Sequence, residues 1–232
     1  MTNSKTRLQS VMNFIKLAEQ QANRPQDSVQ LLAVSKTWPA FRLRELAEAG
    51  QTRFGENYLQ EALEKIAALT DLALEWHFIG PVQSNKTREI AAHFDWVESV
   101  DRLKIAQRLS DQRPANLPPL NICLQVNIDN ESSKSGVQPD KLMELAAAVS
   151  QLDTIRLRGL MVIPAIAETI EQQLDAFGRA QQLFSQLKTA HPDVDTLSMG
   201  MSADMQAAIT QGSTMVRIGT ALFGERHTPD KQ

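Results

Sequence analysis

Lys36 is the residue of this sequence with the clearest chemical potential. It ends an otherwise apolar run, Gln-Leu-Leu-Ala-Val-Ser-Lys at 30–36, which is typical of a buried strand followed by a loop. An amine in such a place loses its proton more easily because burial disfavours charge, and a neutral amine attacks carbonyl carbon. The alternative is a lysine whose aliphatic stem packs while its ammonium group reaches water. This run alone leaves both interpretations open.

A second group of polar residues lies near the other end of the chain, at 198–205 and 216–220. Ser202 directly precedes a helical pattern and is predicted to be the N-cap of that helix. The unpaired N–H groups at the start of a helix suit a phosphate dianion. Gly219 permits close approach of the backbone, and Thr220 adds a hydroxyl and another N–H. These residues predict a phosphate site, although an ordinary serine cap and an ordinary glycine turn give the same pattern.

Arg217 stands inside an apolar, strand-like run at 215–218. A buried guanidinium needs an acceptor, which is either a carboxylate of the core or a heteroaromatic nitrogen of a ligand. In the second case the arginine stays protonated, donates to the ring nitrogen and leaves that nitrogen unprotonated. Such a ring is a weak electron sink but still exchanges Schiff bases. One amine, one phosphate cradle and one buried cation together predict a phosphorylated aldehyde cofactor.

The elements that would position these residues alternate between strand and helix patterns, after an amphipathic opening helix at 4–23. Strands are predicted at 31–35, 53–56, 76–79, 96–99, 121–127, 158–162, 195–198 and 215–218. Helices are predicted at 42–49, 59–68, 86–93, 103–110, 139–150, 170–189 and 203–211. This alternation indicates an α/β fold, a single (β/α)8 TIM barrel with an extra N-terminal helix. The alternative is an open doubly wound sheet, but the residues after the first strand lack its glycine-rich fingerprint.

In a TIM barrel the active site forms where the strands end. The residues predicted at those ends are Lys36, Asn57, Gly80, Ser99 and Asn127 for strands one to five, Pro164 for strand six, Ser202 after strand seven, and Gly219 and Thr220 after strand eight. Loops at strand ends are commonly polar, so this placement supports the chemical interpretation without establishing it.

The composition narrows the class of protein. The chain has 232 residues, 42% of them hydrophobic, which is enough for one sizeable core. Its formal net charge of -3 does not favour nucleic acid as a partner. Cys123 is the only cysteine, in an apolar run, and the four histidines are scattered, so neither a disulfide nor a metal site is expected. Without a signal sequence or a long apolar span, we expect a cytoplasmic protein that does not enter a membrane.

Eight ordered segments of the chain resemble the YggS/PROSC family of pyridoxal-phosphate-binding proteins. They are Ala-Val-Ser-Lys-Thr (33–37), Phe-Gly-Glu-Asn (54–57), Trp-His-Phe-Ile-Gly (76–80), Gln-Ser-Asn-Lys (83–86), Ser-Lys-Ser-Gly (133–136), Leu-Arg-Gly-Leu-Met (157–161), Leu-Ser-Met-Gly-Met-Ser (197–202) and Val-Arg-Ile-Gly-Thr (216–220). The segments run nearly from end to end, so the resemblance is specific.

The resemblance implies a single barrel domain of the alanine-racemase type (fold type III of the pyridoxal-phosphate proteins) over 1–232, with the helix at 1–25 and the barrel at about 30–224. It implies pyridoxal 5′-phosphate as a Schiff base on Lys36. Site residues carried over by the resemblance are Ser202, Gly219 and Thr220 at the phosphate, Arg217 at the pyridine nitrogen and Asn57 near the ring. One departure is Trp38, where some members have a second lysine; Lys134 is a candidate to replace it.

The resemblance further implies a role in intracellular pyridoxal phosphate (vitamin B6) homeostasis, with no robust catalytic activity and with apo-enzymes as possible recipients of the cofactor. The chain length leaves no room for a second domain, which agrees with a carrier and, weakly, with a monomer. The alternative is an amino-acid racemase, decarboxylase or lyase. Inversion needs proton donors on both faces of a carbanion, and Tyr58, the single tyrosine, is a weak candidate for the second. A sugar-phosphate enzyme is a third reading, which leaves Arg217 unexplained.

Overall fold

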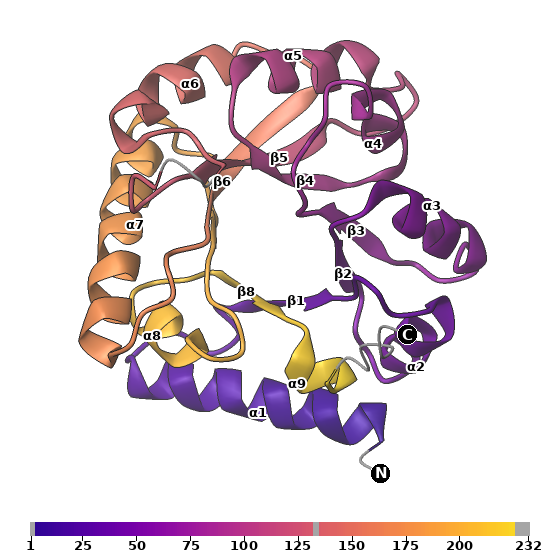
Figure 1. Ribbon diagram of the computed structural model, residues 1–232, viewed down its shortest axis with the longest axis vertical. Coiled ribbons are helices and arrows are strands. Elements are labelled where there is room, and N and C mark those ends of the chain that lie inside the picture. Colours follow the sequence, from indigo (N-terminus) through magenta and orange to yellow (C-terminus); the bar gives the residue numbers. More distant parts are fainter. Residues whose placement is uncertain (1–2, 132–134, 226–232) are drawn as a thin grey trace, which may run out of the picture.

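The computed structural model describes residues 3–131 and 135–225 and shows eight parallel strands in a closed barrel (Figure 1). The strands are β1 (Gln30–Val34), β2 (Arg53–Glu56), β3 (Glu75–Phe78), β4 (Trp96–Val100), β5 (Leu120–Val126), β6 (Ile155–Val162), β7 (Thr196–Ser198) and β8 (Met215–Ile218). Each pairs with its neighbour in sequence, and β8 closes the ring on β1, with Leu32 opposite Arg217. The predicted TIM barrel is therefore confirmed.

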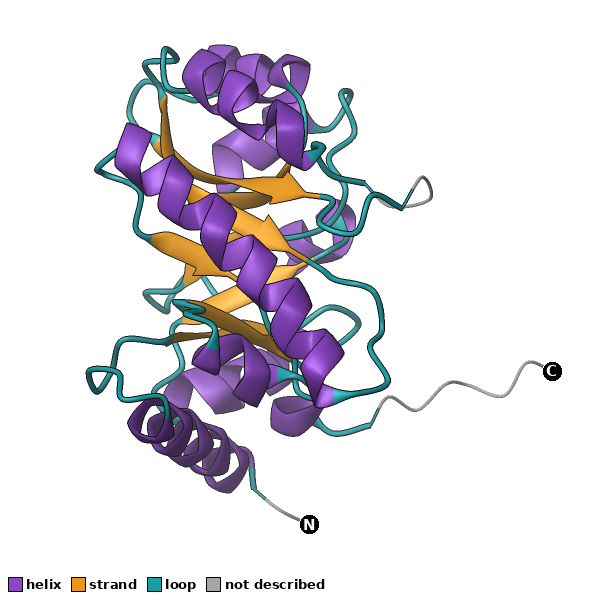
Figure 2. Ribbon diagram, turned by 90° about the vertical axis from the view of Figure 1, so that its left-hand side faces the viewer, coloured by secondary structure: helices purple, strands orange, loops and turns teal. Residues whose placement is uncertain are grey.

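Helices surround this barrel on its outside (Figures 1 and 2). They are α1 (Ser4–Gln21), α2 (Ala40–Glu48), α3 (Leu59–Ala68), α4 (Thr87–His93), α5 (Leu103–Gln112), α6 (Leu142–Val149, after a 3-10 turn at Pro139–Lys141), α7 (Ile170–Ala190), α8 (Met205–Thr210) and α9 (Thr220–Phe223). In the described part of the chain, none of them is long and apolar enough to cross a bilayer.

The opening helix α1 lies along α8 and α9 at one side of the barrel (Figure 1). Its buried apolar stripe of Leu8, Val11, Ile15 and Ala18 has helical spacing, as the sequence predicts. Glu19 is also buried and accepts hydrogen bonds from Ser28 Oγ and the N–H groups of Asp27 and Val29. The carboxylate thus links α1 to the chain that enters β1.

The boundaries of several elements differ from those predicted. β4 continues to Val100, so Ser99 lies within the strand, and β6 ends at Val162, before Pro164. β6 also begins earlier than predicted, at Ile155, because its outward-facing apolar residues alternate with Arg156 and Arg158 and so lack a continuous apolar run. The helix α9 was not predicted, since its four residues are too few to show a period.

The apolar core is divided in two by the barrel wall. A large cluster fills the space between strands and helices, while Trp96, Cys123 and Met161 form a separate small cluster. Side chains alternate across a strand, so every second residue of the wall points into the barrel. This interior is narrow, and in this protein many of its positions are polar, with Glu98, His77, Ser198 and Arg217 all buried.

Helix α3 is attached to the ends of β1 and β2 by a buried ion pair. Lys65 Nζ lies 2.7 Å from Glu56 Oε1 and 2.8 Å from the carbonyl oxygen of Ser35. Ser35 Oγ donates to the same carboxylate at 2.5 Å. Burial raises the pKa of Glu56 above its usual range, although Lys65 and Ser35 act in the opposite direction. The pair fixes the residues on either side of it, Lys36 and Asn57.

Replacing Lys65 by methionine is expected to destabilise the protein by about 3 kcal/mol, because it leaves the Glu56 carboxylate buried and uncompensated. Urea unfolding measures this as a lower midpoint. The double variant Glu56→Gln/Lys65→Met should recover part of the loss. Lys104→Met, at an exposed position of α5, is the control and should unfold like the wild type. An unchanged midpoint in Lys65→Met would show that the pair contributes nothing.

Candidate functional site

The carboxyl ends of all eight strands meet at one mouth of the barrel, because the strands are parallel and the sheet is closed. Lys36 lies two residues beyond β1, Asn57 directly follows β2, and Gly219 and Thr220 directly follow β8. A Cβ atom on Gly219 would lie 3.3 Å from the carbonyl oxygen of Val34, so the ends of β8 and β1 adjoin. The structure therefore brings the predicted amine and the predicted glycine loop to the same mouth.

The backbone around Lys36 is fixed from helix α3. Ser35 is held by Lys65, as described above, and the N–H of Thr37 donates to Glu61 Oε1 at 2.5 Å. Thr37 has a φ of 68°, a left-handed conformation that a β-branched residue rarely adopts. Strained backbone of this kind costs about 1–3 kcal/mol and is concentrated at functional sites. The partly buried Lys36 is thus positioned between two constrained neighbours.

A pocket of about 240 Å³ opens at this mouth. Its lining includes Asn57, Ile79, Gln125, Asn127 and Ile163. The Oδ1 atom of Asn57 is buried and has no hydrogen-bond partner in the described part of the chain. A buried acceptor without a donor is costly, and a ligand that supplies a donor would remove that cost.

Gly80, which follows β3, lies against the backbone of Asn57. A Cβ atom at this glycine would lie 2.2 Å from the carbonyl oxygen of Asn57. The missing side chain therefore lets the two strand ends approach each other, and this contact sets the position of Asn57 in the mouth.

Arg217 is buried in β8 with its guanidinium held by two acceptors. Nη1 donates to Ser198 Oγ and Nη2 to the carbonyl oxygen of Val162, the last residue of β6, each at 2.8 Å. Among the described residues, Nε has no acceptor. Burial lowers the pKa of Arg217 and the charge of Glu98 opposes this effect, but an arginine stays protonated in a protein. One N–H of a fixed cation is therefore available to a ligand.

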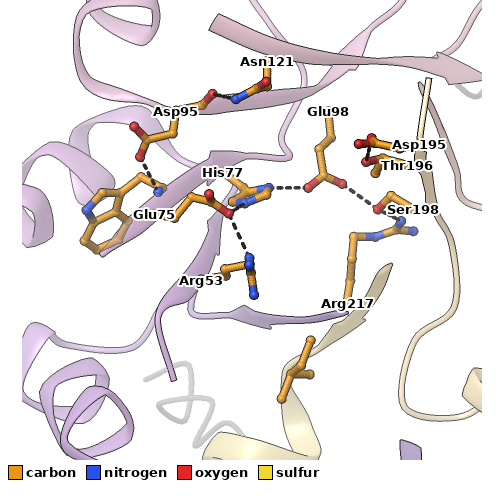
Figure 3. Close-up of polar contacts among 12 residues, drawn as sticks. Arg53, Glu75, His77, Asp95, Glu98, Asn121, Asp195, Thr196, Ser198 and Arg217 are labelled. Carbon is orange, nitrogen blue, oxygen red and sulfur yellow. Dashed lines mark hydrogen bonds and ion pairs between the residues drawn. The ribbon is translucent and has the colours of Figure 1, made fainter. Parts of the chain in front are cut away.

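Behind Arg217, a row of hydrogen bonds crosses the barrel interior (Figure 3). Ser198 Oγ donates to Glu98 Oε2 at 2.6 Å, and Glu98 Oε1 lies 2.7 Å from His77 Nδ1. His77 Nε2 lies 2.9 Å from Glu75 Oε1, which also accepts from Arg53 Nε at 3.0 Å. We refer to Glu75, His77, Glu98, Ser198 and Arg217 as the interior array.

The interior array is not apparent from the sequence, in which His77 is one of four scattered histidines. The signal was the alternation of residue types: positions 75 and 77, and likewise 96 and 98, share the inward face of their strands. The sequence leaves two acceptors open for Arg217, a core carboxylate or a ligand nitrogen. The structure shows that the core carboxylate, that of Glu98, meets Arg217 indirectly, through the Ser198 hydroxyl.

The charge states of the interior groups follow from their surroundings. Burial by itself lowers the pKa of His77, but hydrogen bonds and charges of Glu75 and Glu98 outweigh it, so the pKa is raised. Burial acts to raise the pKa of Glu98, and His77, Arg217 and Ser198 together bring it below the usual range. Burial raises the pKa of the Cys123 thiol well above its usual range, so it packs as a neutral side chain.

The predicted cap of α8 is wrong. The helix begins at Met205 and its N-cap is Asp204, so Ser202 lies in the preceding turn, where it is exposed. Asp204 Oδ1 accepts the N–H of Met201 at 2.6 Å, and its carboxylate provides the negative charge at that helix start. Ser202 can therefore offer a phosphate its hydroxyl and a loop N–H, and the dipole of α8 adds little to the binding of a phosphate there.

Trp38, Tyr58 and Lys134 are three further residues that the sequence suggests for the site. Trp38 stacks on Phe223 of α9 at 5.6 Å and lies under the guanidinium of Arg42, so it packs on the outside of the barrel. Tyr58 is 55% exposed at the start of α3. Lys134 lies outside the described residues.

The chain is similar to known proteins over nearly its whole length. The family model described as "Alanine racemase, N-terminal domain" matches residues 7–227. A pyridoxal phosphate homeostasis protein of Pseudomonas aeruginosa is 61% identical over 212 residues, which is 91% of each chain. The protein of the same name from Escherichia coli K12 is 54% identical over 222 residues, covering 94% of this chain and 95% of that one.

The chain is also similar to solved structures. PipY of Synechococcus elongatus, solved with pyridoxal phosphate bound, is 40% identical and has a TM-score of 0.79, covering 90% of this chain and 98% of PipY. An alanine racemase of Clostridium difficile is 15% identical with a TM-score of 0.71, covering 94% of this chain but 58% of the racemase. The second likeness shows the barrel fold alone.

We expect the stability of the protein to depend on pH through His77. Because its folded pKa lies above the ordinary 6.5, its stabilising effect is complete below that pH and is lost as the pH rises through the raised value. As the pH rises through this value, the urea midpoint of the wild type should therefore decrease relative to that of His77→Gln. His93→Gln, at an exposed position of α4, is the control. A parallel pH dependence in wild type and His77→Gln, or an NMR titration with His77 neutral at pH 6.5, would contradict this expectation.

Proposed function

This chain belongs to the family of pyridoxal phosphate homeostasis proteins and to the alanine racemase N-terminal domain family, and from this premise we propose that it binds pyridoxal 5′-phosphate at the carboxyl mouth of its barrel. Lys36 holds the aldehyde carbon as a Schiff base, and the protein acts in intracellular vitamin B6 homeostasis. The observation that carries the proposal is a pair of polar atoms at the carboxyl mouth, Arg217 Nε and the buried Asn57 Oδ1. Neither has a hydrogen-bond partner among the described residues.

The donors at this mouth fit a phosphorylated pyridine aldehyde. Arg217 presents a fixed N–H to the ring nitrogen, and Asn57 lies at the edge of the pocket beside the ring. Ser202, Gly219 and Thr220 hold the phosphate with two hydroxyls and the loop N–H groups. Gly219 suits this role because it adjoins the end of β1 without a side chain, and because the first N–H groups of α9, which it precedes, have no intrahelical acceptor.

The bound cofactor supplies an aldehyde that condenses reversibly with amines. The protein contributes position and charge. Since Arg217 keeps its proton, it donates to the ring nitrogen and leaves that nitrogen unprotonated, which disfavours carbanion chemistry at the cofactor. Lys36, fixed between Ser35 and Thr37, keeps its amine at the mouth. This combination of firm holding and weak activation suits a carrier of the cofactor better than a racemase.

The proposed role in vitamin B6 homeostasis requires release of the cofactor from the carboxyl mouth of the barrel. An amine that reaches the mouth would compete with Lys36 for the aldehyde, and apo-enzymes that use the cofactor would be the recipients. We expect this exchange to take place in the cytoplasm and the carrier to act as a monomer. Analytical ultracentrifugation of the loaded protein tests the second point, since a stable dimer would contradict it.

Lys36→Ala is expected to abolish the covalent link to pyridoxal phosphate, because it removes the amine that is proposed to form the link. The measurement is the visible absorption of the protein after incubation with the cofactor and removal of the excess. The matched control is Lys104→Ala, at an exposed site on α5, which should load like the wild type. An unchanged visible band in Lys36→Ala would defeat the assignment of the amine.

Ser202→Ala is expected to weaken retention of the cofactor without preventing the link to Lys36. The loss of one hydrogen bond to a charged group, about 1.5 kcal/mol, corresponds to roughly tenfold faster release. Dilution into a large excess of an apo-enzyme, followed by its recovered activity, measures the rate. Ser10→Ala, at an exposed site on α1, provides the comparison. Equal release rates for the two variants would place the phosphate elsewhere.

A further inference from the structure

The interior array has a feature that the cofactor site alone does not explain. It extends from the first residue of β3, Glu75, at the amino mouth, to Arg217, whose guanidinium reaches the end of β6 at the carboxyl mouth. Glu75 is 37% exposed beside a pocket of about 320 Å³ at the amino mouth, while His77 and Glu98 have no exposed surface. A continuous polar row thus joins solvent on one side of the barrel to the mouth on the other side.

The geometry determines the protonation of His77 without reference to any titration. Each of its two ring nitrogens faces a carboxylate oxygen, at 2.7 and 2.9 Å. A neutral imidazole has a proton on one nitrogen only, so the second nitrogen would place a lone pair against a carboxylate. With both carboxylates ionised, His77 is therefore an imidazolium. Charges alternate in sign from Glu75 to Arg217 and cancel within the array.

Other ionisable groups near the array do not change this balance. They are Arg53 of β2, Cys123 of β5, Arg158 of β6, Asp195, which directly precedes β7, and Asp204, the N-cap of α8. Arg158 and Asp195 form their own ion pair, Arg53 pairs with Glu75 Oε1, and Asp204 accepts the N–H of Met201. The ring of Trp96 stacks on His77 at 5.1 Å, with Arg158 on Trp96. The counter-charge of Arg217 in the interior is consequently Glu98.

We propose that Glu98 and Ser198 are positioning residues for the cofactor, which hold the guanidinium of Arg217 so that its Nε–H faces the ring nitrogen, with His77 as the buried cation that keeps Glu98 ionised. The inference rests on the proposed function and adds residues to its site. Ser198 connects the two charges: its hydroxyl accepts from Nη1 and donates to Glu98, so neither the serine nor the arginine can turn without breaking a charge-assisted bond.

Substitutions of Ser198 and of Glu98 are expected to affect Arg217 and His77 in different ways. Ser198→Ala removes the bridge but keeps both charges, so Arg217 loses its orientation while His77 stays an imidazolium. Glu98→Gln keeps the shape but removes the charge, so the buried His77 loses one of its two carboxylates and titrates at lower pH. Ser213→Ala removes a buried hydroxyl that bonds only backbone carbonyls, and it is the control for the loss of a serine in the interior of the fold.

The first experiment uses the protein without cofactor. In the ¹⁵N-labelled wild type, we expect both ring nitrogens of His77 to be protonated at pH 7 and the Nη1–H of Arg217, which donates to Ser198, to exchange slowly. Ser198→Ala should speed that exchange at least tenfold. Arg113, whose Nη1 donates to the carbonyl oxygens of Ala91 and Phe94, is an internal reference that should not change. A neutral His77 in the wild type, or unchanged exchange at Arg217 in Ser198→Ala, would overturn the proposal.

The second experiment uses the protein loaded with pyridoxal phosphate. Ser198→Ala and Glu98→Gln should shift the visible absorption maximum and release the cofactor about tenfold faster, while the covalent link to Lys36 still forms. A structural defect alone would not shift the absorption maximum. Ser213→Ala tests this, because it removes an interior serine and should leave the maximum unchanged. If both variants load and release like the wild type with the same maximum, the positioning role is overturned and the proposed function stands. If the wild type takes up no pyridoxal phosphate, both fail.

Discussion

A carboxylate with no exposed surface, that of Glu98, lies in the interior of the barrel and must be compensated there. An unpaired buried charge costs several kcal/mol, so the neighbouring strand β3 supplies His77 on one side. Strands β7 and β8, across the barrel, supply Ser198 and Arg217 on the other. Because these residues come from β3, β4, β7 and β8, the requirement acts across the whole ring. The same hydrogen bonds that neutralise Glu98 determine how Arg217 faces the carboxyl mouth.

The mouth itself depends on contacts outside the barrel wall. Helix α3 provides Lys65, which holds Ser35, and Glu61, which holds the strained Thr37, so the helix fixes Lys36 from both sides. Gly80 and Gly219 then allow neighbouring strand ends to approach. A partly buried lysine, a fixed cation and a loop of small residues thus occupy one mouth, and this arrangement favours holding a cofactor over activating it.

Much of the fold was predictable because barrel strands leave a plain signal of short apolar runs separated by helical periods. Two strands, Arg53–Glu56 and Met215–Ile218, and the helix Leu59–Ala68 lie where the sequence predicts them. The start of α8 was not predictable: Ser202 and Asp204 are both good N-caps, and tertiary packing decides between them. Single residues such as Lys36 and Arg217 stood out because a charge interrupts an apolar run. His77 and Glu98 did not, since their partners are distant in sequence and meet only when the barrel closes.

Peptide mapping after chemical trapping can establish whether Lys36 holds pyridoxal phosphate. The wild-type protein is loaded with the cofactor, reduced with borohydride and digested, and the modified peptide is identified by mass spectrometry. Our account predicts a single pyridoxyl group on the peptide that contains Lys36. A pyridoxyl group on another lysine, or a protein that remains unmodified, would contradict it.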